Sequence, residues 1–138
     1  MIGRKNNKYL EIKEHTHKKY TILRKYLEAC KKFADKYGNF VYIDTHGGSG
    51  KVLDIKTGKL IDGSPLIARK LVNPTFPCYA IEVRKDRYKL LKKSTKNLQN
   101  FRVIWGDCNK KIEEILKNIE EWKFFLDFFI KFAIFNQF

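Results

Sequence analysis

The sequence predicts one α/β domain with about four mainly parallel strands flanked by helices, and with a small β-hairpin. Its 138 residues suit a single domain. Hydrophobic residues make up 43% of the chain and aromatic residues 14%, which is enough apolar surface for a buried core. Amphipathic, helix-like stretches alternate with short runs that are apolar throughout, and such runs are typical of a parallel sheet covered on both faces.

The first part of the chain predicts an arm, a helix and a strand. Residues 1–15 are polar and charged, and we expect a basic arm there, ahead of an α/β domain at 16–138. From Thr16 onward, apolar residues recur at spacings of three and four, which predicts an amphipathic helix with Thr16 as its cap and Gly38 at its end. Residues 40–43 then read as a short buried strand.

A glycine-rich loop follows this strand. It reads Asp44-Thr45-His46-Gly47-Gly48-Ser49-Gly50, and two short β-type runs around a Gly turn continue to residue 62, which predicts the hairpin. Gly63-Ser64-Pro65 then predicts the start of a helix at 66–72, with the serine as its cap and the proline in its first turn.

The rest of the chain continues the alternation of strand and helix. Tyr79 and Trp105 fall inside predicted strands, so we expect both in the core. The predicted elements are a strand at 78–83, a helix at 85–98, a strand at 101–105, a helix at 109–120 and a fourth strand at 124–127.

The charge balance suggests a polyanionic partner. There are 29 Lys and Arg residues against 15 Asp and Glu, which gives a net charge of +14. This sign of charge suits nucleic acid, and a solvated, Lys-rich face is the alternative interpretation. The candidate phosphate contacts are four residues of the first helix, Lys18, Lys19, Arg24 and Lys25.

Cysteine usage and hydropathy indicate the cellular compartment in which we expect the protein. The cysteines, at 30, 78 and 108, are odd in number and form no C-x-x-C, so we expect neither a disulfide framework nor a metal site. No signal peptide is visible, and the longest apolar stretch, 124–138, contains Asp127 and Lys131 and is shorter than the roughly 20 residues of a membrane span. We expect a cytoplasmic protein without membrane association.

The glycine loop does not match two common phosphate-binding patterns. A Walker A loop needs a glycine where Thr45 stands and Ser or Thr where Val52 stands. The dinucleotide pattern needs a third glycine where Leu53 stands, and a helix directly after the loop instead of a hairpin. Glycines still let backbone N–H groups approach a ligand closely, so a nucleotide-like molecule is expected here. His46 in this loop has two open interpretations, a loop-packing residue or a proton acceptor.

Acidic residues stand at or near the ends of the four predicted strands: Asp44, Glu82, Asp107 and Asp127. Ligands bind outside the carboxyl ends of strands in open α/β sheets, so the four acids are expected to converge on one crevice. Glu82 is placed to accept protons from the hydroxyls of a ribose, and Asp107 from an exocyclic amine. Taken singly, each acid also reads as an ordinary capping residue.

These residues resemble the class I S-adenosylmethionine-dependent methyltransferases, and among them the three-Cys-motif partner protein family. The resemblance covers about residues 16–127. It is carried by the loop at 42–50, the detached Gly63-Ser64-Pro65-Leu66-Ile67-Ala68, Ile81-Glu82, Gly106-Asp107-Cys108-Asn109 and Phe125-Leu126-Asp127.

The resemblance implies a Rossmann-like methyltransferase fold and S-adenosylmethionine as cofactor. Asp44 and the loop residues Gly47, Gly48, Ser49 and Gly50 would hold its methionine part. Glu82 would hold the ribose, and Asp107 with the Cys108 amide the adenine. Asp127 would lie beside the transferred methyl group as the catalytic residue, and catalysis would consist mainly of aligning nucleophile, methyl and sulfur.

The resemblance also has implications for whether the sheet is complete and for which partners the chain binds. Such methyltransferases have a seven-stranded sheet, whereas only 11 residues follow Asp127, so an incomplete fold is expected, with the fourth-strand edge open to self-association. The three cysteines of the family name belong to a partner protein and not to this chain. The competing hypothesis is a non-catalytic basic module that binds nucleic acid or a partner protein, and cofactor binding separates the two.

Overall fold

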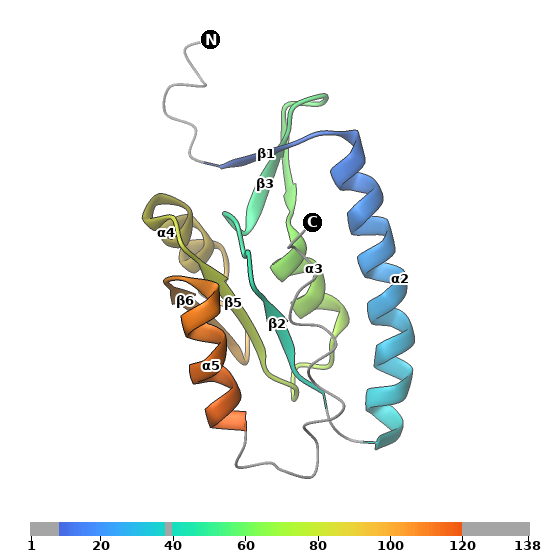
Figure 1. The fold of residues 1–138 in the computed structure, drawn as a ribbon. Coiled ribbons are helices and arrows are strands. Elements are labelled where there is room, and N and C mark those ends of the chain that lie inside the picture. The colour runs from blue at the N-terminus through green and yellow to red at the C-terminus, as the bar shows by residue number, and fades with distance from the viewer. Residues whose placement is uncertain (1–8, 38–39, 120–138) are drawn as a thin grey trace.

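The computed structural model of the protein describes residues 9–37 and 40–119. These residues form a mixed α/β structure in which four helices accompany two three-stranded sheets (Figure 1). In chain order the elements are β1 (Leu10–Ile12), α2 (Glu14–Tyr37), β2 (Tyr42–Asp44), β3 (Lys51–Asp54), β4 (Lys59–Asp62), α3 (Ser64–Leu71), β5 (Cys78–Glu82), α4 (Lys85–Ser94), β6 (Phe101–Trp105) and α5 (Cys108–Ile119).

The main sheet has the strand order β2-β5-β6 and is parallel throughout. Strands that are consecutive in it are joined through α3 and then α4, as parallel pairing requires. The smaller sheet has the order β1-β3-β4, with β1 parallel to β3 and β3 antiparallel to β4. The predicted parallel strands and the predicted hairpin are therefore confirmed within the described residues.

Different helices cover the two faces of the main sheet. Tyr42 and Cys78 are paired in register and belong to an apolar cluster with buried residues of α2 and α3. Ile43, the next residue along β2, belongs to a second cluster with Ile81 of β5 and Ile115 of α5. Because side chains alternate across a strand, the sheet lies between α5 and the helices α2 and α3 (Figure 1).

A buried arginine fastens α3 to the end of the sheet. The Arg69 guanidinium, only 5% exposed, donates to the carbonyls of Phe76 and Asn100 at 2.7 and 3.0 Å. It also donates to the carbonyls of Val72 and Asn73 at 3.1 and 2.7 Å. One side chain thus satisfies four carbonyls where α3 ends and where β6 begins. The helical pattern of this segment did not single out Arg69.

The structure corrects the prediction for the amino end. Residues 10–12, assigned to a loose arm, form β1 and pair with β3. The backbone N–H of Leu10 also donates to Ser49 Oγ at 2.9 Å. The helix begins at Glu14, so Thr16 lies inside α2 and is not its cap. A three-residue strand is too short to show a hydrophobic period, and only its partner β3 defines it.

Other boundaries shift by a few residues, and one cap is reassigned. The N-cap of α3 is Gly63, and Ser64 is the first helical residue, so Ser64 is not the cap. The Ser64 hydroxyl instead donates a hydrogen bond to Asp44. Helix α4 ends at Ser94 because Thr95 leaves the helical conformation. The predicted cap Gly38, the fourth strand at 124–127 and the apolar end of the chain lie outside the described residues. Among the described helices, none combines the length and the apolar character that crossing a membrane requires.

Candidate cofactor-binding site

Three of the four predicted acids lie along one edge of the main sheet. Asp44 is the last residue of β2, Glu82 is the last residue of β5, and Asp107 follows β6 by two residues. The register pairs Asp44 with Ala80 and Glu82 with Trp105, so the carboxyl ends of the strands follow one another across the sheet. This edge is where open α/β sheets bind ligands. The predicted catalytic residue Asp127 lies outside the described residues.

Asp44 is fully buried and organises the start of the glycine loop. Its Oδ2 accepts hydrogen bonds from the Tyr42 hydroxyl at 2.9 Å and from the Ser64 hydroxyl at 2.5 Å. Its Oδ1 accepts one from the His46 backbone N–H at 3.1 Å. Burial and the adjacent Asp44 carboxylate raise the pKa of Tyr42 well above its usual value, so Tyr42 stays a donor. Asp44 therefore ties β2, the loop and the start of α3 together.

Glu82 connects the glycine loop to the end of β5. Its Oε1 accepts a hydrogen bond from the Gly48 backbone N–H at 2.8 Å, and its Oε2 accepts one from the Arg84 backbone N–H at 2.8 Å. The residue is 6% exposed, so both bonds lie in a largely water-free setting. Each carboxylate oxygen keeps a second lone pair, which leaves Glu82 able to accept hydrogen bonds from a ligand.

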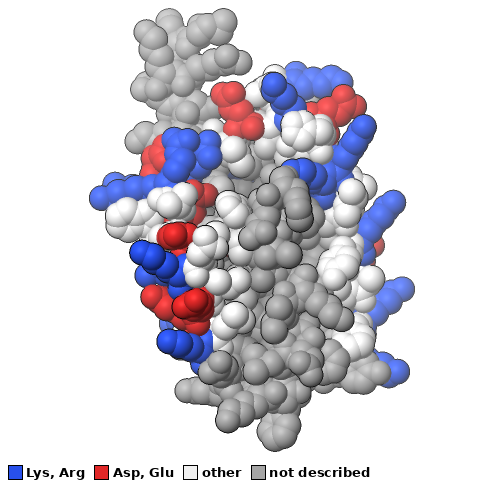
Figure 2. Space-filling model, in the orientation of Figure 1, with Lys and Arg blue, Asp and Glu red and all other residues white. Residues whose placement is uncertain are grey.

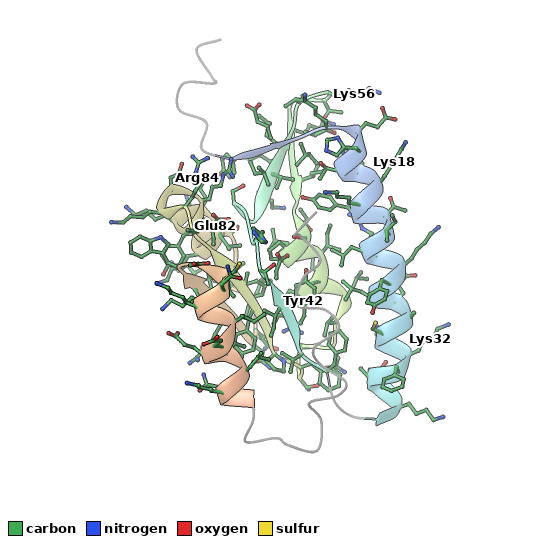
Figure 3. The ribbon with its side chains drawn as sticks, viewed as in Figure 1. Lys18, Lys32, Tyr42, Lys56, Glu82 and Arg84 are labelled. Atoms are coloured by element: carbon green, nitrogen blue, oxygen red, sulfur yellow. The ribbon has the colours of Figure 1, made fainter. Side chains whose placement is uncertain are left out.

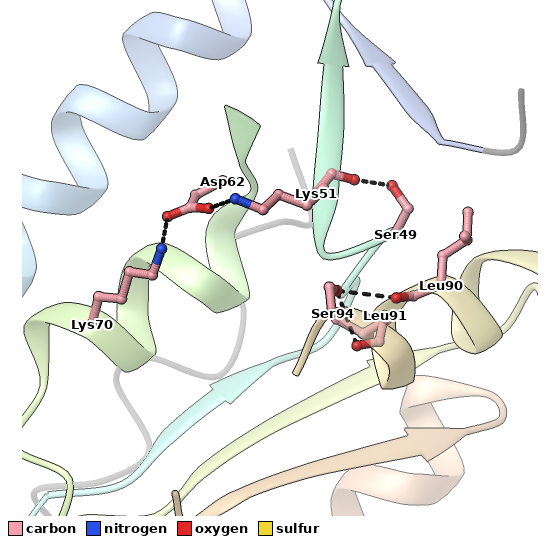
Figure 4. Close-up of polar contacts among 7 residues, drawn as sticks. All are labelled: Ser49, Lys51, Asp62, Lys70, Leu90, Leu91 and Ser94. Carbon is pink, nitrogen blue, oxygen red and sulfur yellow. Dashed lines mark hydrogen bonds and ion pairs between the residues drawn. The ribbon is translucent and has the colours of Figure 1, made fainter. Parts of the chain in front are cut away.

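The glycines of the loop allow close packing against α4 and β5. The Gly47 backbone N–H donates to the Ile81 carbonyl at 2.8 Å, and a Cβ at Gly47 would lie 2.8 Å from Leu91 Cδ2. Gly50 has φ +77°, and a Cβ there would overlap the Ser94 hydroxyl oxygen. That hydroxyl is held by the Leu90 and Leu91 carbonyls (Figure 4). A Cβ at either position would require a neighbouring side chain to move, and at Gly50 the positive φ favours glycine in addition.

The residues at the two ends of the hairpin segment are in contact with each other. The Gly63 backbone N–H donates to the Gly50 carbonyl at 2.7 Å, and a Cβ on Gly63 would approach that oxygen to 2.5 Å. Helix α3 therefore begins beside the end of the glycine loop, although 12 residues separate Gly50 from Gly63 in the sequence. In the structure, strand β2, the glycine loop and helix α3 therefore follow one another directly. In the sequence, the hairpin stands between the loop and the helix.

An exposed apolar residue follows Glu82 at the end of β5. Val83, directly after Glu82, is 62% exposed. Exposed Asp107 accepts a hydrogen bond from the Asn109 backbone N–H at 3.0 Å, and Cys108, half-buried, begins α5. Asp107 thus caps the helix, as the plainer interpretation of this acid expected. Val83 was not among the predicted site residues, and its place directly after the strand-end acid Glu82 is the signal that could have pointed to it.

A pocket of about 200 Å³ opens between β1, the start of α2 and the glycine loop. Lys19, Tyr20, His46, Gly47 and Ser64 are among its lining residues. Burial and the Asp44 carboxylate raise the pKa of Tyr20 to about 12, although Arg24 acts in the opposite direction. The His46 Nδ1 forms a hydrogen bond with Thr45 Oγ1 at 2.9 Å. The pocket therefore carries mixed charge and several hydrogen-bonding groups.

The basic residues predicted to contact phosphate all lie on α2. Lys18, Arg24 and Lys25 are exposed, whereas Lys19 is half-buried and lines the pocket. Lys18 and Lys32 project away from the sheet (Figure 3). Lys and Arg side chains gather along this outer side of α2 and, separately, on the opposite flank of the molecule (Figure 2). On that opposite flank, acidic side chains lie among the basic ones (Figure 2).

Comparison with protein-family models finds no match for this chain, and comparison with curated proteins finds no significant match. In residues 9–37 and 40–119, no three His, Cys, Asp or Glu side chains gather in a way that suits a metal ion. His17, near the start of α2, instead bonds Asp54 Oδ2 at 3.0 Å.

Proposed function

We propose that this chain is an S-adenosylmethionine-binding domain of the Rossmann-like methyltransferase type, related to the three-Cys-motif partner proteins and working in the cytoplasm. One observation carries the proposal: the Glu82 carboxylate at the end of β5 meets the Gly48 N–H of the loop that follows β2, at 2.8 Å. The bond brings together a glycine loop and a strand-end acid, the two features with which open α/β sheets bind nucleotides at this edge.

The topology supports the same proposal. Three parallel strands stand in sequential order with α3 and α4 as their connections, and α5 packs on the face opposite α3. The closed hairpin brings the start of α3 to the glycine loop through the Gly63–Gly50 hydrogen bond. A Rossmann-like mononucleotide-binding half has this arrangement of strand, glycine turn and helix.

The proposed cofactor would lie along the edge from the pocket to α5. A pocket of about 200 Å³ is smaller than the roughly 300–1,000 Å³ that whole drug-sized ligands occupy, so it suits one end of the cofactor. The amino-acid end fits there, since Lys19 and His46 line it. Glu82 would accept from the ribose hydroxyls. Exposed Val83 offers apolar surface to the adenine, beside Asp107 and the Cys108 N–H.

The proposed chemistry is methyl transfer to an acceptor, and the family resemblance assigns Asp127, which lies outside the described residues, as its catalytic residue. A sulfonium is already an activated leaving group, so the domain's own residues would bind and orient and would supply little covalent help. A nucleic acid is the acceptor class that the charge of +14 favours. A protein with a three-Cys motif is the further partner that the family resemblance suggests.

Titration with S-adenosylhomocysteine by calorimetry tests the proposal. Val83→Glu places a charge where the adenine would lie, and it should abolish binding without unfolding an exposed site. Leu60→Glu is the matched control, because Leu60 is also exposed, at 45%, but lies on the hairpin. Control and wild-type protein should bind alike. Absence of binding to the wild-type protein, or equal binding by both variants, would overturn the proposal.

A further inference from the structure

Two aromatic rings, one exposed and one half-buried, form a pair at the flank of the molecule remote from α2. Trp105, the last residue of β6, is 49% exposed, and its ring stacks with that of Tyr88 on α4 at a centroid distance of 6.2 Å and an interplanar angle of 28°. The indole N–H donates to the Val83 carbonyl at 3.0 Å and fixes the ring. This corrects the sequence prediction of a core tryptophan: among the described strands, β6 pairs only with β5, so its end lies at an edge.

Each of the two rings has a lysine ammonium group close to it. The Lys85 ammonium lies 5.4 Å from the Trp105 ring centroid, and the Lys92 ammonium lies 5.8 Å from that of Tyr88. Asp86, the one acid of α4, is bound to the Arg84 guanidinium at 2.7 and 3.1 Å. The basic residues of α4 are Lys85, Arg87, Lys89, Lys92 and Lys93.

We propose that Trp105 and Tyr88, flanked by Lys85 and Lys92, form a contact site for single-stranded nucleic acid. Exposed aromatic rings stack on unpaired bases, and nearby ammonium groups attract the phosphates that connect them. Lysines over ring faces are held by weak contacts at an exposed site, so an incoming base displaces them easily. A duplex hides its base faces, which is why a single strand is the fitting partner.

This site differs from the phosphate contacts predicted on α2. Helices α2 and α4 lie on opposite flanks of the main sheet (Figure 1), and the described part of α2 presents lysines without an exposed tryptophan. Helix α2 also exposes Tyr26 and Phe33, whereas on α4 and β6 two rings stack on each other and each has a lysine ammonium group close to it. The proposal goes beyond cofactor binding and does not depend on it.

Fluorescence anisotropy with a labelled single-stranded oligothymidylate, in the absence of cofactor, tests the stacking. Trp105→Leu should weaken binding by about 5- to 150-fold, the range for loss of one stacked base. Trp105→Phe keeps a ring without the indole N–H and should retain most of the affinity. Tyr26→Leu is the matched control, because Tyr26 is exposed at 46% but lies on α2, and it should leave the affinity unchanged.

A duplex of equal length separates stacking from a general loss of structure or charge. Trp105→Leu should leave duplex affinity unchanged. Equal losses on single strand and duplex, equal losses for Trp105→Leu and Trp105→Phe, or no loss at all would each overturn the proposal.

The charge contribution is measured separately, in variants that keep both rings. Lys85→Gln should reduce the slope of log affinity against log salt by about 0.7 for a single strand, and Lys59→Gln on the hairpin should not. Equal slopes for the two variants would overturn the assignment of Lys85 to phosphate. Because these assays contain no S-adenosylhomocysteine, failure of the calorimetric test leaves their outcome intact.

Discussion

Gly48 donates its backbone N–H to Glu82 Oε1 across 2.8 Å, although the two residues are 34 positions apart. The bond joins the loop after β2 to the end of β5, and the second oxygen of Glu82 binds the Arg84 N–H at 2.8 Å. A single buried carboxylate thus sets the distance between two segments of the ligand edge. It gives Glu82 a structural role before any ligand is considered.

Replacing Glu82 by Ala should therefore lower stability as well as cofactor binding. The variant leaves buried N–H groups without an acceptor, which costs about 1–3 kcal/mol for each unsatisfied group. Glu113→Ala, at an exposed position of α5, should change the free energy of unfolding by no more than about 0.5 kcal/mol. Urea denaturation measures both variants. Equal stabilities would contradict the role assigned to the Gly48–Glu82 bond.

The packing of the glycine loop can be tested by comparing two glycines with nearly the same backbone. Gly50 and Gly58 have φ of +77° and +72°, so alanine costs about 1–2 kcal/mol of backbone strain at either position. An added Cβ meets nothing within 4 Å at Gly58 but overlaps Ser94 at Gly50. Gly50→Ala should lose a further 1–3 kcal/mol or so in thermal or urea unfolding. Similar losses for both variants would show that α4 does not pack against the loop.

Removing the Arg69 guanidinium should be among the most destabilising changes in the described chain. Arg69→Met removes one donor from four carbonyls and should cost about 3 kcal/mol. The Asn73 and Asn100 carbonyls keep their bonds from the Phe76 and Cys78 N–H groups. Arg69→Lys keeps the charge but lacks the planar fork that reaches four oxygens, so it should recover only part of the loss. Arg102→Met, exposed on β6, provides the control. If Arg69→Met and the control unfold at the same urea concentration, the stabilising role assigned to Arg69 is wrong.

Stability should fall in acid through the ion pairs of Asp62. Asp62 binds Lys51 Nζ at 2.6 Å and Lys70 Nζ at 2.5 Å, joining the hairpin to α3 (Figure 4). Burial raises the pKa of Asp62, but the hydrogen bonds and charges of the two lysines outweigh it, so the pKa is lowered. A carboxylate with a lowered pKa stabilises the fold above its unfolded value of about 3.9 and loses that contribution as the pH falls.

Comparison of the wild-type protein with Asp62→Asn measures this contribution. The difference in free energy of unfolding between them should be constant above about pH 5 and should shrink as the pH drops below about 4. Urea titrations at a series of pH values show the trend. A difference that is independent of pH would contradict it.

Much of the fold follows from local patterns. The amphipathic spacing of Leu23 and Leu27 and the continuous apolar run before Asp44 predict α2 and β2, because burial follows the helical and strand periods directly. The acids Asp44, Glu82 and Asp107 were found for a similar reason, since the end of a parallel strand fixes which sheet edge a residue occupies. Strand β1 escaped prediction because three residues carry no period and only pairing with β3 defines them.

The sequence by itself determined the order of strand and helix, the glycine loop and the acids that follow the strands, because each depends on residues that are neighbours in the chain. Only the tertiary structure decided the long-range contacts: the Gly63–Gly50 hydrogen bond, the hydrogen bonds of Arg69 and the Glu82–Gly48 bond. It also decided that Trp105 is exposed. The physical reason is that these contacts join segments far apart in sequence. Their distances, and whether the tryptophan at the end of β6 meets core or solvent, depend on how the sheet is assembled.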